Sequence, residues 1–282
     1  MGCRIVIRLG AAALAAALLS GCESIGSAFE DPEVALDSRS AIEIFETAEA
    51  SLDNGDPEEA AKTFDEVERL YPFSQLAKRA TIMSSYSHYE AGDMPSSRAA
   101  AQRYLDLYPT DEDAPYAQYL IALTYYDNIV DVGRDQAMTQ RALEELTEVV
   151  RRYPGTDYAR DAKLKLDLTS NHLAGKEMAI GRYYLKRGHY MAAINRFRVV
   201  IENFQTTSQT PEALHRLVES YLAMGLNQEA QTVAAVLGEN FVGSDWYAAS
   251  YALLTDRDLR PATRDDGFFS RIYRQIIQGK WL

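Results

Sequence analysis

Few side chains in this 282-residue sequence have the types and spacing that catalysis or metal binding requires. Asp127, Asp131 and Asp135 follow one another at intervals of four, but the glycine and glutamate of a calcium-binding EF-hand loop are missing. We interpret Asp135 as the N-cap of a helix over 136–152. The four histidines have no partner at the i, i+4 spacing of a metal site. With no nucleophile elbow, phosphate loop or acid–base pair either, we expect no metal, no cofactor and no enzymatic activity.

The residue with the clearest chemistry is Cys22. Two arginines precede an apolar run at 9–19, as in a secretory signal, and this run is too short to span a bilayer. It leads into Leu-Ser-Gly-Cys at 19–22, which resembles the lipobox of bacterial lipoproteins. In that class of signals the cysteine is acylated and becomes the first residue of the mature chain. An ordinary secretory signal with a chance cysteine is the alternative.

We therefore predict a lipoprotein signal peptide over 1–21 and a membrane anchor at Cys22. Two or three acyl chains anchor a protein stably, whereas one chain binds only marginally. Only one cysteine would remain in the mature chain, which excludes an internal disulfide. The formal net charge of −12 would repel a phosphate backbone, so nucleic acid is not expected as a partner.

The middle of the chain repeats with a period of 37 residues. Gly-Asp at 55–56 recurs at 92–93, Tyr-Pro at 71–72 recurs at 108–109, and Gly188 is followed by a glycine at 225. A fixed period of this size is typical of stacked helical hairpins, and the tetratricopeptide unit has about 34 residues. We predict an all-α solenoid of about five such repeats, over 41–74, 78–111, 115–154, 174–207 and 211–244.

A long helix is expected between the third and fourth repeats, because no proline interrupts 157–187. The predicted organisation is a tether at 22–38, N-terminal repeats one to three at 39–155, and a connecting helix at 156–187 whose end is the first helix of repeat four. C-terminal repeats four and five follow at 188–254, and a charged linker with an amphipathic helix at 255–282. The apolar stripe of that last helix either caps the final repeat or docks on another subunit or the membrane surface.

Two sequence segments add a family resemblance to this organisation. They are Tyr-Tyr-Leu-Lys-Arg-Gly at 183–188 and Ala-Ile-Asn-Arg-Phe at 193–197. The third repeat is also interrupted, by an insertion around 127–135 between its two helices. Together with the lipobox, this interruption and the long helix, the two segments resemble the BamD (ComL) family. These are lipoproteins of the machinery that assembles outer-membrane β-barrels.

The resemblance implies an outer-membrane lipoprotein that faces the periplasm, and it implies three kinds of protein partner. The C-terminal repeats would bind the periplasmic domains of BamA, and the N-terminal repeats would recognise targeting signals of unfolded outer-membrane proteins. Other lipoproteins of the assembly complex would be further partners. The family's basic residue at the BamA contact falls on Arg196, with Arg187 and Arg198 beside it in sequence. A solvated arginine is the alternative for Arg196. A periplasmic repeat lipoprotein that scaffolds cell-wall synthesis is the alternative function.

The first helices of the repeats are expected to line a groove that binds peptides. Projection of the repeat frame places in this groove Ile82, Met83, Tyr86, Tyr89, Tyr116, Tyr119, Leu120, Leu123 and Tyr126. Of these, the five tyrosines are the candidate peptide-binding residues, because aromatic rings provide burial and their hydroxyls can bond a peptide backbone. The alternative for any one tyrosine is simple packing between helices.

Overall fold

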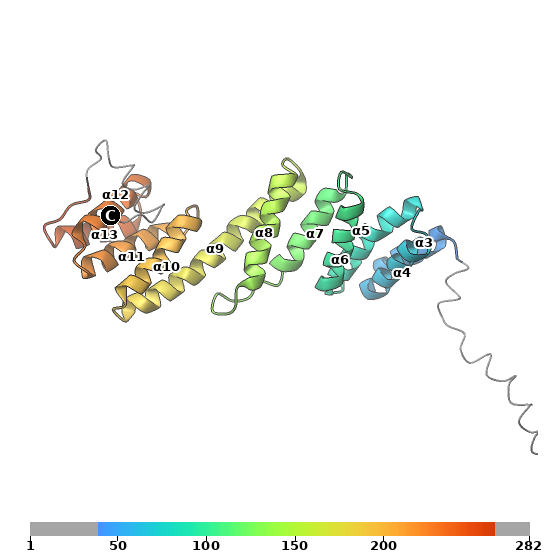
Figure 1. The fold of residues 1–282 in the computed structure, drawn as a ribbon, viewed down its shortest axis with the longest axis horizontal. Helices are drawn as coiled ribbons and strands as arrows, with labels where there is room; N and C mark the ends of the chain where they lie inside the picture. The colour runs from blue at the N-terminus through green and yellow to red at the C-terminus, as the bar shows by residue number, and fades with distance from the viewer. Residues whose placement is uncertain (1–38, 263–282) are drawn as a thin grey trace, which may run out of the picture. The chain divides into compact units, whose positions relative to one another are not determined.

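The computed structural model describes residues 39–262, and every regular element in this range is an α-helix (Figure 1). This confirms the all-α prediction. The chain forms two compact units, one that ends at Ser87 and one that begins at His88. The predictions for the signal peptide, for Cys22, for the tether and for the apolar stripe of the tail concern residues outside the described range.

The first unit contains a helical hairpin and most of a third helix. These are α3 (Ala41–Asp53), α4 (Pro57–Leu70) and α5 (Gln75–Glu90). Helix α3 begins at a capping box, in which Ser40 and Glu43 each accept a hydrogen bond from the other's backbone N–H. Phe45 of α3 and Phe64 of α4 meet edge to face, with ring centroids 5.2 Å apart. The apolar sides of the hairpin are thus buried against each other.

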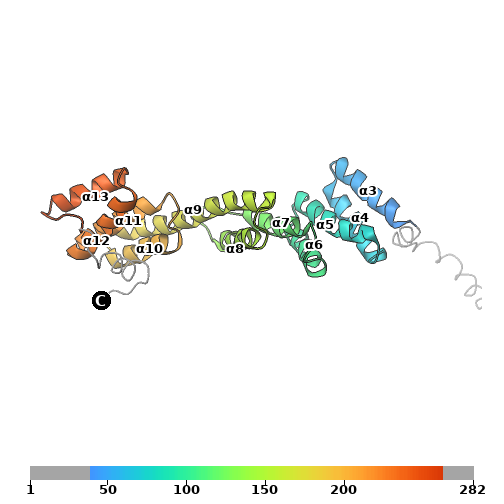
Figure 2. The same cartoon turned by 90° about the horizontal axis from the view of Figure 1, so that it is seen from above.

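The second unit continues from the end of α5. Its described helices are α6 (Met94–Leu107), α7 (Ala114–Tyr126), α8 (Ala137–Arg152), α9 (Asp157–Lys186), α10 (Tyr190–Asn203), α11 (Thr210–Ala223), α12 (Asn227–Asn240) and α13 (Asp245–Thr255). Each of these helices packs against the next, and α7, α9, α11 and α13 also contact one another in that order (Figures 1 and 2). This two-way packing is typical of tetratricopeptide-like repeats and confirms the predicted solenoid.

The four glycines identified by the period all have a left-handed backbone. Their φ angles are +80° at Gly55, +79° at Gly92, +75° at Gly188 and +76° at Gly225. Glycine adopts this conformation without the steric penalty of a Cβ atom, so it suits the tight turn between two helices. After Gly225, the N–H of Leu226 bonds the carbonyl of Tyr221 at 2.9 Å, a pattern typical of helix C-termini.

Close helix packing in the fourth repeat depends on Gly181. A Cβ atom at this position would lie 2.3 Å from Cε1 of Phe197, in the facing helix α10. Phe197 is itself completely buried, so its ring has no free space to move into. The missing side chain of Gly181 therefore allows α9 and α10 to approach each other.

The predicted long helix is present as α9, which has 30 residues and begins at an N-cap formed by Thr156. Its first half packs against α7 and α8, and its second half packs against α10 and α11 (Figure 2). One continuous helix therefore contributes to the third and the fourth repeats, and it links them without a loop.

Two details of the sequence analysis were wrong. Helix α8 begins after Gln136, not after Asp135. The buried Gln136 side chain donates hydrogen bonds to the carbonyls of Asp131 and Arg134, so it closes the loop before the helix. Ile82 and Leu120, which were projected onto a peptide groove, are 5% and 1% exposed and belong to the core. A first helix contacts neighbours on several sides, so fewer of its positions reach the surface than the projection assumed.

The sequence did not predict α13 as a separate element. This helix begins at Ser244, whose hydroxyl accepts a hydrogen bond from the N–H of Tyr247 at 3.2 Å. It packs against α11 and α12, and Leu254 is completely buried there.

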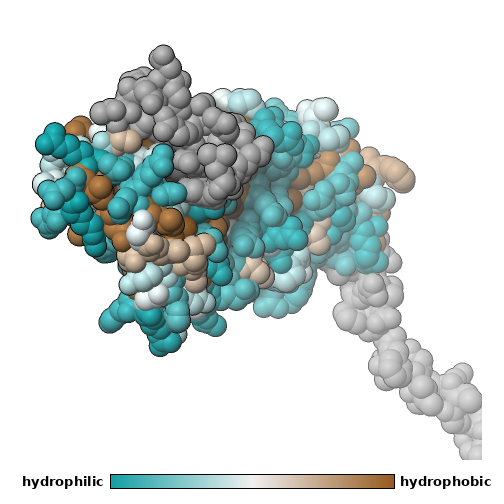
Figure 3. All heavy atoms as spheres, turned by 60° about the vertical axis from the view of Figure 1, so that its left-hand side comes forward, coloured by the Kyte–Doolittle hydropathy of each residue, from teal (hydrophilic) through white to brown (hydrophobic). Residues whose placement is uncertain are grey.

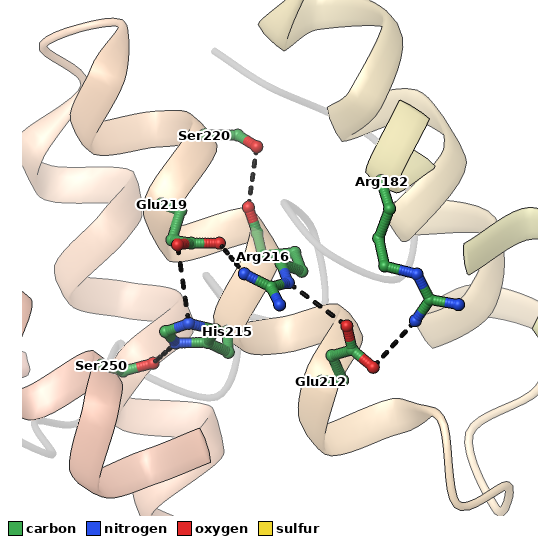
Figure 4. Close-up of polar contacts among 7 residues, drawn as sticks. All are labelled: Arg182, Glu212, His215, Arg216, Glu219, Ser220 and Ser250. Carbon is green, nitrogen blue, oxygen red and sulfur yellow. Dashed lines mark hydrogen bonds and ion pairs between the residues drawn. The ribbon is translucent and has the colours of Figure 1, made fainter. Parts of the chain in front are cut away.

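Polar contacts join α9, α11 and α13 (Figure 4). Glu212 of α11 accepts hydrogen bonds from Arg182 of α9 at 2.9 Å and from Arg216 at 3.2 Å. His215 lies against α13, where its Nδ1 is 2.8 Å from the Ser250 hydroxyl. Burial lowers the pKa of His215, so this imidazole is neutral near pH 7. Glu219 joins the two sets of contacts, because it lies 2.7 Å from Arg216 and 3.7 Å from His215. The network therefore connects α9, α11 and α13.

Candidate binding surfaces

Three of the candidate tyrosines lie on α7, in the second unit, and two of these pack against α9. The ring centroid of Tyr158 in α9 is 5.3 Å from that of Tyr116 and 5.6 Å from that of Tyr119. All three rings are half-buried. The α7 tyrosines thus contribute to helix packing and also keep part of their surface exposed.

The hydroxyl of Tyr119 belongs to a small charged cluster on α9. It donates a hydrogen bond to Asp161, which also accepts one from Lys165 at 2.6 Å. Burial and the bond to the Asp161 carboxylate raise the pKa of Tyr119 to about 12. The hydroxyl therefore remains protonated, and Lys165 also interacts with its oxygen.

The remaining two candidates differ in where the structure places them. Tyr89 is in the second unit and donates a hydrogen bond to Asp127, next to Tyr126 at the end of α7. Lys165 Nζ lies 5.5 Å from the ring centroid of Tyr126, within the range of a cation–π contact. Tyr86 lies in the first unit and is half-buried. The second unit thus brings four of the five candidate tyrosines to its α7–α9 side.

The three candidate arginines do not form one cluster. Arg196 of α10 pairs with Glu177 of α9 at 3.1 Å, and its side chain is 43% exposed. Arg198 pairs with Glu202 of its own helix at 2.8 Å and is only 18% exposed. Two positions along an α-helix are separated by about 200°, so these two side chains point to opposite sides. Of the two, Arg196 has the more exposed side chain.

Arg187 lies at the end of α9 and stacks on an exposed ring. Its guanidinium carbon is 4.2 Å from the ring centroid of Tyr183, which is 51% exposed. An exposed arginine–tyrosine pair is the kind of group that proteins use to bind other proteins.

Two apolar grooves near these residues were missed by the sequence analysis. One has a volume of about 620 Å³ and is lined in part by Tyr184, Met191 and Met224. The other, of about 380 Å³, lies between Val132 and α9 and also reaches Tyr184. Met191 is 56% exposed, and methionine adapts to many partner surfaces. In the sequence, these grooves could have been expected from an apolar residue next to a turn glycine, as in Met-Gly at 224–225.

Neither metal-ligand clusters nor membrane-spanning helices occur in the described part of the chain. No group of three or more histidine, cysteine, aspartate or glutamate side chains in that part is arranged to hold an ion. None of its helices combines the length and the apolar character needed to cross a bilayer.

The family model described as YfiO, outer membrane lipoprotein, matches residues 37–237 of the chain. A protein from Caulobacter vibrioides named outer membrane protein assembly factor BamD is 50% identical over 89% of this chain and 82% of its own length. The chain belongs to the BamD family of outer membrane lipoproteins. BamD from Rickettsia prowazekii is 42% identical over 72% of this chain and 81% of its own. BamD from Neisseria meningitidis is 29% identical over 79% of this chain and 87% of its own length.

Membership of the BamD family confirms the resemblance inferred from the sequence. The match to the family model spans the helices from α3 to most of α12, so it covers the first four predicted repeats and most of the fifth. The relatives are named as assembly factors and not as enzymes, which agrees with the expectation of a non-catalytic protein. The roles of Arg196 and of the tyrosines remain predictions.

Proposed function

We propose that this chain is a non-catalytic scaffold for the assembly of outer-membrane β-barrel proteins. It is anchored through Cys22, faces the periplasm, and works with BamA and the other lipoproteins of the assembly complex. The observation that supports this proposal most strongly is the close similarity to proteins named as assembly factors. Stacked helical hairpins suit such a role, because they offer extended surfaces to other polypeptides.

The proposed BamA contact is centred on Arg196. Glu177 holds the guanidinium in a fixed position, yet an ion pair at this level of exposure contributes only about 0–1 kcal/mol. A carboxylate of the partner can therefore share or replace Glu177 and form a bidentate pair with the arginine.

Replacing Arg196 with glutamate is expected to reduce co-purification of BamA by at least about tenfold. The new carboxylate repels the partner's carboxylate and also Glu177, whereas the fold keeps its buried contacts. Affinity purification from detergent-solubilised membranes measures the effect. Arg160→Glu is the matched control, because it makes the same charge change at an exposed position near the start of α9. Normal recovery of BamA with Arg196→Glu, at unchanged thermal stability, would contradict the assignment.

The proposed site for targeting signals uses the α7–α9 side of the second unit. The half-exposed rings of Tyr116, Tyr119 and Tyr126 offer stacking surfaces for an extended peptide that ends in an aromatic residue. Asp161 and Lys165 orient the Tyr119 hydroxyl. Tyr86 of the first unit is a further candidate.

Tyr119→Ala and Tyr86→Ala are each expected to weaken binding of such a peptide by about tenfold, because each removes an aromatic surface. Fluorescence anisotropy with a labelled peptide that ends in phenylalanine measures the affinity. Tyr119→Phe is the matched variant, since it keeps the ring, and it should retain most of the binding. An unchanged affinity in a folded Tyr119→Ala protein would exclude this tyrosine from the site.

A further inference from the structure

The turn that follows helix α13 has the same geometry as the turn that follows α11, the first helix of the fifth repeat. Asp258 follows it with φ +55°, and this is the one non-glycine residue with positive φ in the described chain. The N–H of Leu259 bonds the carbonyl of Leu254 at 2.9 Å. The turn after α11 has the same two features 33 residues earlier, at Gly225 and in the bond from Leu226. The turn after α13 therefore has the geometry that elsewhere leads into the second helix of a repeat.

A position of α13 that corresponds to a buried position of α11 is exposed. The same offset of 33 residues matches Val218 with Tyr251. Val218 is 0% exposed, whereas Tyr251 is 45% exposed. The side of α13 that lies beyond the fifth repeat is thus shaped like an interior surface.

This exposed side has the composition of an interface. No charged residue occurs between Trp246 and Thr255, and Ala249 and Ala252 lie on the exposed side with Tyr251. Small residues allow a second helix to approach closely. A helix that ends a repeat array normally presents a polar outer face, which α13 lacks. Apolar residues reach the surface at this end of the second unit (Figure 3).

The residues that follow the turn after α13 lie against α12. The side chain of Gln231 in α12 donates a hydrogen bond from Nε2 to the backbone carbonyl of Arg260 at 2.7 Å. The backbone carbonyl of Gln231 accepts a hydrogen bond from the N–H of Ala262 at 3.1 Å. Residues 260–262 are therefore fixed to the second helix of the fifth repeat. Each second helix in the second unit packs against the first helix of its own repeat, as α10 does on α9 and α12 on α11, so a second helix that followed α13 would pack on α13.

We propose that residues 268–277 cover the exposed side of α13 and complete a sixth repeat. This segment has apolar residues at helical spacing, namely Phe268, Phe269, Ile272, Tyr273, Ile276 and Ile277. Arg271 and Arg274 fall on the opposite side, which suits a solvent-facing surface on a chain with a net charge of −12. The occupant of the surface is thus the chain's own tail, not a second copy or another protein.

A crosslink between α13 and the tail tests the proposal in the full-length protein. Tyr251→Cys combined with Ile272→Cys should form a disulfide within one chain after mild oxidation, located by mass spectrometry. The matched pair Arg160→Cys and Ile272→Cys, with its first cysteine at the far end of α9, should form none. Absence of the 251–272 link, or a link between two different chains, would overturn the proposal.

Hydrogen exchange gives a second test that needs no cysteine. A chain that stops after Ala262 should exchange the amides of α13 at least about tenfold faster than the full chain, because α13 loses apolar cover. The amides of α7 and α8 should exchange at unchanged rates in both proteins. Equal protection of α13 with and without the tail would overturn the proposal.

Discussion

Replacing Gly181 with alanine is expected to destabilise the C-terminal repeats by about 1–3 kcal/mol. The added methyl group would lie 2.3 Å from the ring of Phe197, which is completely buried and cannot turn away without disturbing its neighbours. The α9–α10 pair must then separate or repack. Urea denaturation followed by circular dichroism measures the loss as a lower midpoint of the transition.

Gly175→Ala is the control for Gly181→Ala, because Gly175 lies six residues away in the same helix. A Cβ atom at Gly175 would have only Val132 Cγ1 nearby, at 3.8 Å, an ordinary van der Waals contact. Gly175→Ala should therefore stabilise the protein by about 0.5–1 kcal/mol through helix propensity alone. Phe197→Leu should reduce the penalty of Gly181→Ala, because the smaller side chain makes room. Equal stabilities of the two alanine variants would contradict the packing described for α9 and α10.

Replacing Cys22 with serine is expected to abolish lipid attachment. The serine hydroxyl cannot accept acyl groups from the lipoprotein pathway, and each buried CH₂ of an acyl chain contributes about 0.8 kcal/mol to anchoring. Metabolic labelling with palmitate should mark the wild type and not the variant. After a urea wash that removes protein-mediated attachment, only the wild type should stay with the membrane pellet.

Cys3→Ser is the matched control for Cys22→Ser. Cys3 lies in the segment expected to be removed, so this variant should incorporate palmitate as the wild type does. Palmitate incorporation that survives Cys22→Ser would show that the lipobox assignment is wrong.

The sequence predicted the features of the fold that depend on local backbone chemistry. Gly188 and Gly225 mark turns because their positive φ excludes most other residues. The long helix α9 was predictable because no proline interrupts it. The turn after α13 was not predicted, because Asp258 takes the left-handed conformation there and not a glycine. Aspartate tolerates this conformation but does not mark it reliably in a sequence.

The binding surfaces were less predictable, because they depend on which residues of neighbouring repeats meet. The spacing of Tyr119 places it on a first helix, but only the packing of α7 on α9 brings it to Tyr158 and Asp161. Likewise, Arg196 gains Glu177 as a partner through the α9–α10 contact. These pairs are separated by 19 or more residues in sequence, so no local pattern identifies them.

The central claim is that the C-terminal repeats contact BamA, and in-cell photocrosslinking from position 196 tests it most directly. A photoreactive amino acid in place of Arg196 lies on the exposed side of α10, within reach of any partner bound there. Our account predicts a crosslink to the periplasmic part of BamA, and none when the same amino acid replaces Arg160. Crosslinks from position 196 only to proteins of cell-wall synthesis, or equal capture of BamA from position 160, would contradict it.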